Sequence, residues 1–190
     1  MEGSSNKESG KRKFTKIKTF VVPSSPEEIK EDIFINSNLI KKSSQEQIIN
    51  QAIKLHKKGK LREAFISYKD IINQGLNDHR VFLNYGLILK AMGKLKEAEL
   101  YQRKAIELKP DFAKAHSNLG NILKATGKLK AAEESQRLAI KFESDFAEAH
   151  LNLGAILIEL NKPEEALVYY SNAISLKPSC KEALENRMKL

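Results

Sequence analysis

The side chains that most often carry catalysis or hold metals are few in this sequence, and their spacing does not build a site. The chain has four histidines and one cysteine, Cys180. His116 and His150 lie 34 residues apart, at equivalent positions of two sequence repeats. Side chains on stacked helix pairs are separated by on the order of 10 Å, whereas zinc ligands lie about 2 Å from the ion. We therefore interpret these two histidines as packing residues.

A phosphate-binding or nucleophilic site is not indicated either. The pair Gly127-Lys128 superficially resembles a phosphate loop, but Leu129 stands where such a loop requires Ser or Thr. Cys180 has no neighbouring residues that would activate a thiol. No combination of nucleophile, base and oxyanion donors is present, so we predict a protein that is not an enzyme and uses no metal or cofactor.

The residues whose spacing does suggest a function are asparagines that recur every 34 residues. They are Asn50, Asn84, Asn118 and Asn152. Asparagine is unfavourable inside a helix, and its amide can both donate to and accept from a peptide backbone. We interpret the column as a binding site for an extended peptide. The alternatives are a hydrogen bond within each repeat, or inheritance by repeat duplication.

Other residues of the same helices are expected to share the face of this asparagine column. The candidate peptide-binding groove adds Arg80, Lys90, Lys114, Asn121 and Lys124 to the four asparagines. The same face also receives Leu83, Leu87, Ser117, Glu148, Leu151, Ala155 and Ile158. These positions predict a groove with a basic middle and an apolar end.

The elements that position these residues are helical hairpins in a repeating array. Residues 79–112 and 113–146 align without gaps and are identical at 18 of 34 positions. Each unit contains two stretches with helical spacing of apolar residues, separated by a turn at Gly59, Gly93, Gly127 or Asn161. Glycine, and asparagine next, best tolerate the positive φ of a helix end. We therefore expect a left-handed residue at all four turns.

Two further sets of recurring residues predict how the helices begin and pack. Asn77, Asp111, Asp145 and Ser179 are suited to be N-caps of the helices that follow them. Small residues mark close helix crossings, and they are Gly86, Gly120, Gly154, Ala64, Ala98, Ala132, Ala166, Ala105, Ala139 and Ala173. At the end of the chain, Leu184 and Met188 predict a helix that covers the last repeat.

This pattern resembles the tetratricopeptide repeat, on the residues Phe82, Tyr85-Gly86, Leu89, Ala98, Ala105 and Pro110 and their counterparts. It is similar to bacterial arrays and to the repeat region of O-linked N-acetylglucosamine transferase, which carries such an asparagine ladder. The resemblance implies an all-α, right-handed solenoid of four helix-turn-helix repeats. We place the repeats at 45–78, 79–112, 113–146 and 147–180 within a domain spanning 45–190. A capping helix follows at 181–190, and 1–44 form an irregular arm with a candidate short hairpin.

Composition and charge limit the class of partner. The net charge is +9, which favours an acidic partner, but no nucleic-acid module or interleaved exposed aromatics accompany it. A single cysteine, no glycosylation sequon and no long apolar run indicate a cytoplasmic protein that does not enter membranes. We predict a scaffold that binds a protein or peptide partner. The alternative is the substrate-targeting arm of a glycosyltransferase or sulfotransferase whose catalytic domain is absent from this chain, either lost or encoded separately.

Overall fold

The computed structural model describes residue 42 and residues 44–190, and these are built from helices without a strand. The predicted N-terminal arm with its hairpin lies outside the described residues, apart from residues 42 and 44, which are helical. A first helix covers 44–57. The following helices are α2 (Leu61–Asn73), α3 (His79–Ala91), α4 (Leu95–Leu108), α5 (Ala113–Ala125), α6 (Leu129–Phe142), α7 (Ala147–Glu159), α8 (Pro163–Leu176) and α9 (Lys181–Met188).

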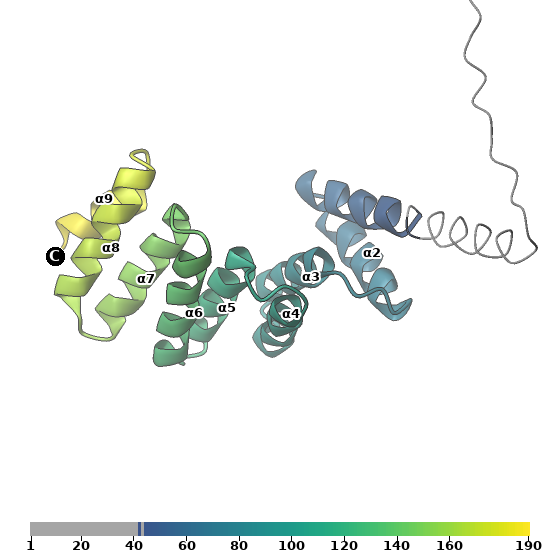
Figure 1. Cartoon of the computed structure of the whole chain (residues 1–190), viewed down its shortest axis with the longest axis horizontal. Helices are drawn as coiled ribbons and strands as arrows, with labels where there is room; N and C mark the ends of the chain where they lie inside the picture. The colour runs from purple at the N-terminus through teal and green to yellow at the C-terminus, as the bar shows by residue number, and fades with distance from the viewer. Residues whose placement is uncertain (1–41, 43) are drawn as a thin grey trace, which may run out of the picture. The chain divides into compact units, whose positions relative to one another are not determined.

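The helices pack as hairpins that stack in chain order (Figure 1). Helix α3 packs against α4, α5 against α6, and α7 against α8. Contacts of α4 with α5 and of α6 with α7 join one hairpin to the next, while α3, α5 and α7 also touch in sequence. This is the predicted solenoid, and it places the first helices of successive repeats side by side.

The turn inside each hairpin adopts the conformation that the sequence predicts. Gly59, Gly93 and Gly127 have φ of 74°, 75° and 76°. Asn161 takes the same place in the fourth repeat with φ of 58°, and it is the one residue other than glycine with positive φ in the described part of the chain. The prediction for all four turns is confirmed.

Asn161 provides a local test of this turn. We expect Asn161→Ala to lower the free energy of unfolding by about 1 kcal/mol, because alanine lacks the side chain that makes positive φ tolerable for asparagine. Asn161→Gly should leave stability unchanged or raise it slightly, since glycine adopts this conformation without strain. Thermal denaturation followed by circular dichroism compares the two variants. Equal melting temperatures for them would contradict the argument.

The predicted N-caps are wrong by one residue. The caps are Asp78, Phe112, Phe146 and Cys180, each directly after a predicted one. Of these, only Asp78 bonds through its side chain, accepting from the backbone N–H groups of Arg80 and Val81. Burial would raise the pKa of Asp78, but hydrogen bonds from Arg80 outweigh it and hold that pKa below its usual value.

The predicted small residues lie at the helix crossings, where they are fully buried. The alanines of all four repeats at 64, 98, 132 and 166 have 0% exposure. Opposite Gly86, Gly120 and Gly154 lie larger buried residues, Gln102, Gln136 and Tyr170. Tyr68 is buried at the equivalent position of the first repeat, where Ala52 takes the place of the glycine. The amide of Gln102 donates to the Leu83 carbonyl at 3.1 Å, and that of Gln136 donates to the Ser117 carbonyl at 2.9 Å. These bonds tie the two helices of a repeat together.

The repeated histidines are structural, as the sequence indicates. His116 and His150 are 6% exposed. Nε2 of His116 lies 2.8 Å from the Pro110 carbonyl oxygen, and Nε2 of His150 lies 2.9 Å from that of Ser144. A carbonyl can only accept, so Nε2 carries the proton and donates in both. Each ring thereby fixes the loop that precedes its own helix.

The last helix, α9, packs against α8 and α7. It does so through Ala183, which is fully buried, with Leu184 partly buried beside it. Met188 is 76% exposed, so the predicted contribution of this residue to the cover is wrong. The small Ala183 lets α9 lie close to the fourth repeat, and Glu182 projects from the first turn of α9 toward the groove described next.

Candidate functional site

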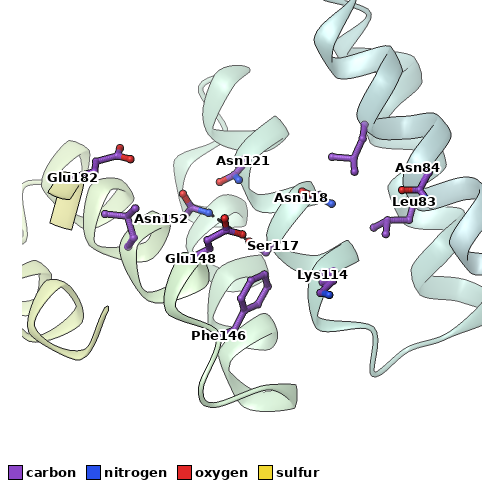
Figure 2. A pocket seen from close by; sticks show the side chains of 12 residues that line it. Leu83, Asn84, Lys114, Ser117, Asn118, Asn121, Phe146, Glu148, Asn152 and Glu182 are labelled. Atoms are coloured by element: carbon purple, nitrogen blue, oxygen red, sulfur yellow. Dashed lines mark hydrogen bonds between the residues drawn. The ribbon is translucent and has the colours of Figure 1, made fainter. Parts of the chain in front are cut away.

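A groove of about 510 Å³ runs along the first helices of the second, third and fourth repeats. Helices α3, α5 and α7 supply most of its walls, with α9 at one end (Figure 2). Its lining consists of Leu83, Asn84, Leu87, Lys114, Ser117, Asn118, Asn121, Phe146, Glu148, Leu151, Asn152 and Glu182. Carboxamides, leucines and a few charges thus share one surface, a composition suited to a peptide.

Three asparagines of the predicted column line this groove. Asn84, Asn118 and Asn152 come from α3, α5 and α7 and follow one another across Figure 2. Each is partly exposed. Their identical offset from Gly86, Gly120 and Gly154 gives them the same direction on stacked helices. Asn50 lies elsewhere, in a separate hollow of the first repeat.

The amide nitrogens of the column differ in their hydrogen bonds. Nδ2 of Asn84 donates to the Arg80 carbonyl at 2.8 Å, within its own helix. Nδ2 of Asn152 lies 3.4 Å from the Ser117 hydroxyl of the preceding repeat, at the limit of a hydrogen bond. Asn118 makes no side-chain hydrogen bond with any described residue. The Asn84 amide thus makes a hydrogen bond within its own repeat, which is one of the alternatives that the sequence left open, whereas the amides of Asn118 and Asn152 do not.

The amide oxygens of the column share one property. Within residues 44–190, no group donates a hydrogen bond to Oδ1 of Asn84, Asn118 or Asn152. An asparagine oxygen can accept two hydrogen bonds, so each of the three can accept from a ligand in the groove. Asn121 is different, because its Oδ1 accepts from Nε2 of the buried Gln136 at 3.0 Å. Asn121 lines the groove but serves to hold Gln136.

The predicted basic residues are mostly not groove residues. Arg80 pairs with Glu46 at 2.7 Å and with Asp78 at 2.9 Å. The pKa of its guanidinium is raised above the usual value, mainly by the hydrogen bonds to Glu46 and next by those to Asp78. Lys124 pairs with Glu159 of the next repeat at 3.1 Å. Lys90 lies outside the groove lining.

The charges that remain in the groove are of both signs. Lys114 lines it without an ion pair to any described residue, as do Glu148 and Glu182. The groove therefore carries one lysine on α5 and two acids toward its α9 end, rather than a basic strip. The sequence did not predict Phe146 or Glu182 as groove residues. Phe146 directly precedes α7 and Glu182 lies in the first turn of α9, so neither belongs to the first-helix positions from which the groove was predicted. The recurrence of Phe112 and Phe146 at 34 residues is the signal that could have found one of them.

Two other kinds of site find no support among residues 42 and 44–190. No group of three His, Cys, Asp or Glu side chains is placed to hold a metal ion. None of the helices there combines the length and apolar character of a membrane span.

Comparison with known proteins assigns the repeats. Three family models, each described as tetratricopeptide repeat, match residues 79–112, 101–134 and 147–180. The first and last of these ranges coincide with the predicted second and fourth repeats. A search of curated proteins gave no match.

Solved structures with the same architecture are numerous. MamA is 22% identical with a TM-score of 0.62, over 73% of this chain and 91% of that one. YrrB, a TPR protein with an unusual peptide-binding site, is 24% identical with a TM-score of 0.65, over 73% and 71%. The first TPR of Spaghetti (RPAP3), bound to the HSP90 peptide SRMEEVD, is 25% identical with a TM-score of 0.57, over 58% and 88%. These likenesses show the fold.

Proposed function

We propose that this chain, a tetratricopeptide-repeat protein with the build of a protein-interaction scaffold, is non-catalytic and holds an extended segment of a partner protein in the groove. One observation carries the proposal. Asn84, Asn118 and Asn152, from three successive repeats, line a single groove with their amide oxygens unpaired among the described residues. Two of the similar structures are described as binding peptides, which supports the same reading.

The spacing of the asparagines suits a particular peptide conformation. Successive repeats place equivalent side chains on the order of 10 Å apart. A polyproline II helix has three residues per turn and rises about 3.1 Å per residue, so every third N–H faces the same side about 9 Å further on. A flat β-strand alternates its N–H groups with period two and would present every third one to opposite sides. The asparagine column therefore fits a partner in the polyproline II conformation.

The rest of the lining suits side chains of such a partner. Leu83, Leu87 and Leu151 offer apolar surface. Lys114, free of ion pairs with described residues, fits an acidic residue. Since the asparagines contact the backbone, the partner sequence is constrained only at these side-chain contacts. The scaffold would thus accept a family of related segments.

A proline scan of a bound peptide tests both the contact and the conformation. Peptides would first be selected from a random-sequence display library against the full chain. We expect proline, which lacks the N–H, to weaken binding at every third position by about two- to tenfold, the loss of one net hydrogen bond of about 0.5–1.5 kcal/mol. Proline at the other two positions of each three-residue turn should be tolerated, because proline favours the polyproline II conformation.

The dissociation constants would be measured by fluorescence anisotropy for each proline-substituted peptide. A loss of affinity at every second peptide position would indicate that the peptide binds as a β-strand instead. Uniform tolerance of proline at all positions would exclude recognition of the backbone by the asparagine oxygens.

A further inference from the structure

Among residues 44–190, many of the cationic side chains lie near the turns of the hairpins, and few lie in the groove. The turns of the first three repeats carry Lys54, Lys57, Lys58, Lys60, Arg62, Lys90, Lys94, Lys96, Lys124, Lys128 and Lys130. The fourth turn has Lys162 together with Glu159, Glu164 and Glu165. The first turn is the most basic, with five cations among residues 54–62.

Ion pairs neutralise the later turns more than the first. Lys94 pairs with Glu97 at 3.4 Å, Lys124 with Glu159 at 3.1 Å, and Lys128 with Glu99 at 3.0 Å. In the first turn, only Lys60 has an acidic partner in the described chain, Glu63 at 3.0 Å. The other cations there are exposed without one, and they are Lys54, Lys57, Lys58 and Arg62. This end of the array thus keeps four cations that pair with no acidic side chain of the described residues.

A hollow lies beside this charge. Its volume is about 470 Å³, and its walls are Asn50, Gln51, Lys54, Leu55 and Lys58, all from the first helix and its turn. Lys54 and Lys58 are four residues apart and so project from the same side of the helix. Nδ2 of Asn50 donates to Glu46 at 3.1 Å, while its oxygen has no partner among the described residues. We call this surface the basic hollow.

We propose that the basic hollow is a second binding site, which takes an acidic segment of a partner protein. Carboxylates of that segment pair with the Lys54 and Lys58 ammonium groups. Its backbone N–H groups donate to the oxygens of Asn50 and Gln51, and an apolar side chain covers Leu55. The site shares no residue with the groove lined by Asn84, Asn118 and Asn152, so it stands independently of the function proposed for that groove.

The lining of the basic hollow favours an acidic peptide over an anionic lipid bilayer or a nucleic acid. Carboxamides beside the lysines match a peptide backbone, which a lipid headgroup layer does not offer. None of the described residues that line the hollow is aromatic, so they offer no platform for stacking with nucleic-acid bases.

The test uses a fluorescein-labelled peptide of alternating glutamate and leucine with the full chain, in a fluorescence anisotropy titration at low salt. The variant K54E/K58E should bind about tenfold or more weakly, because two attractive contacts become repulsive. The control K141E/K177E changes the net charge equally at two exposed lysines outside both sites, and it should change binding less than twofold. Circular dichroism checks that both variants keep their helices.

Each other outcome overturns the proposal in a recognisable way. Equal losses in K54E/K58E and K141E/K177E would mean that the peptide follows net charge and no local site. Loss in N84A/N118A/N152A but not in K54E/K58E would place the acidic peptide in the groove. Anionic phosphatidylserine vesicles or duplex DNA that displace the peptide and bind more tightly through Lys54 and Lys58 would identify a different class of partner. Full binding by N84A/N118A/N152A with loss in K54E/K58E is the expected pattern.

Discussion

Replacing Gly120 with leucine should lower the free energy of unfolding by roughly 1–3 kcal/mol or more, the cost of overpacking a filled core. A Cβ at this position would lie 2.7 Å from Nε2 and 3.0 Å from Cδ of Gln136. Gln136 is completely buried. Its amide also donates to the Ser117 carbonyl at 2.9 Å, so the side chain cannot turn away without breaking a buried hydrogen bond. Urea denaturation monitored by circular dichroism measures the loss.

The matched control places the same side chain on the same helix. Ala125 is the last residue of α5 and is exposed, so Ala125→Leu should change stability by no more than about 0.5 kcal/mol. If Gly120→Leu and Ala125→Leu shift the urea midpoint equally, the close crossing of α5 and α6 does not limit the size of residue 120.

Features that depend on local conformation were predictable from the repeats. The turn at Asn161 was recognised because the requirement for positive φ is satisfied by few residue types. Helix starts were less predictable, since a cap depends on the single residue at which the helix begins. Asp111 is a good cap by type, but the helix begins one residue later and Phe112 occupies the cap position.

Features that depend on which side chains meet across repeats were harder to predict. Arg80 looked like a groove residue because its own helix faces the groove, yet Glu46, 34 residues earlier, binds its guanidinium. Opposite charges separated by one repeat length are the signal for such pairs. The buried Gln102 and Gln136 were overlooked for a similar reason, since polar residues are not expected in a core. Their alignment with Tyr68 and Tyr170 at the repeat period marks them as crossing residues.

The groove asparagines should dominate affinity for the partner. We expect N84A/N118A/N152A to weaken the binding of a selected peptide by at least tenfold, because three net hydrogen bonds of about 0.5–1.5 kcal/mol each are lost. Helical content should stay intact, since alanine favours helices more than asparagine does. The one side-chain bond to a backbone carbonyl that the variant loses, from Asn84 to Arg80, lies within a single turn of α3. Anisotropy titrations give the affinities, and circular dichroism gives the helical content.

A matched triple variant separates the groove from a general effect of removing amides. Asn73, Asn77 and Asn172 are exposed and lie outside the groove lining, so N73A/N77A/N172A should bind within twofold of the original chain. Lys114→Ala should instead reduce the salt dependence of binding, since an exposed lysine acts through a screened field. Unchanged affinity in N84A/N118A/N152A with intact helices would show that the column is a product of repeat duplication. The salt dependence of Lys114→Ala would then be the remaining evidence for binding in the groove, through charge rather than through backbone hydrogen bonds.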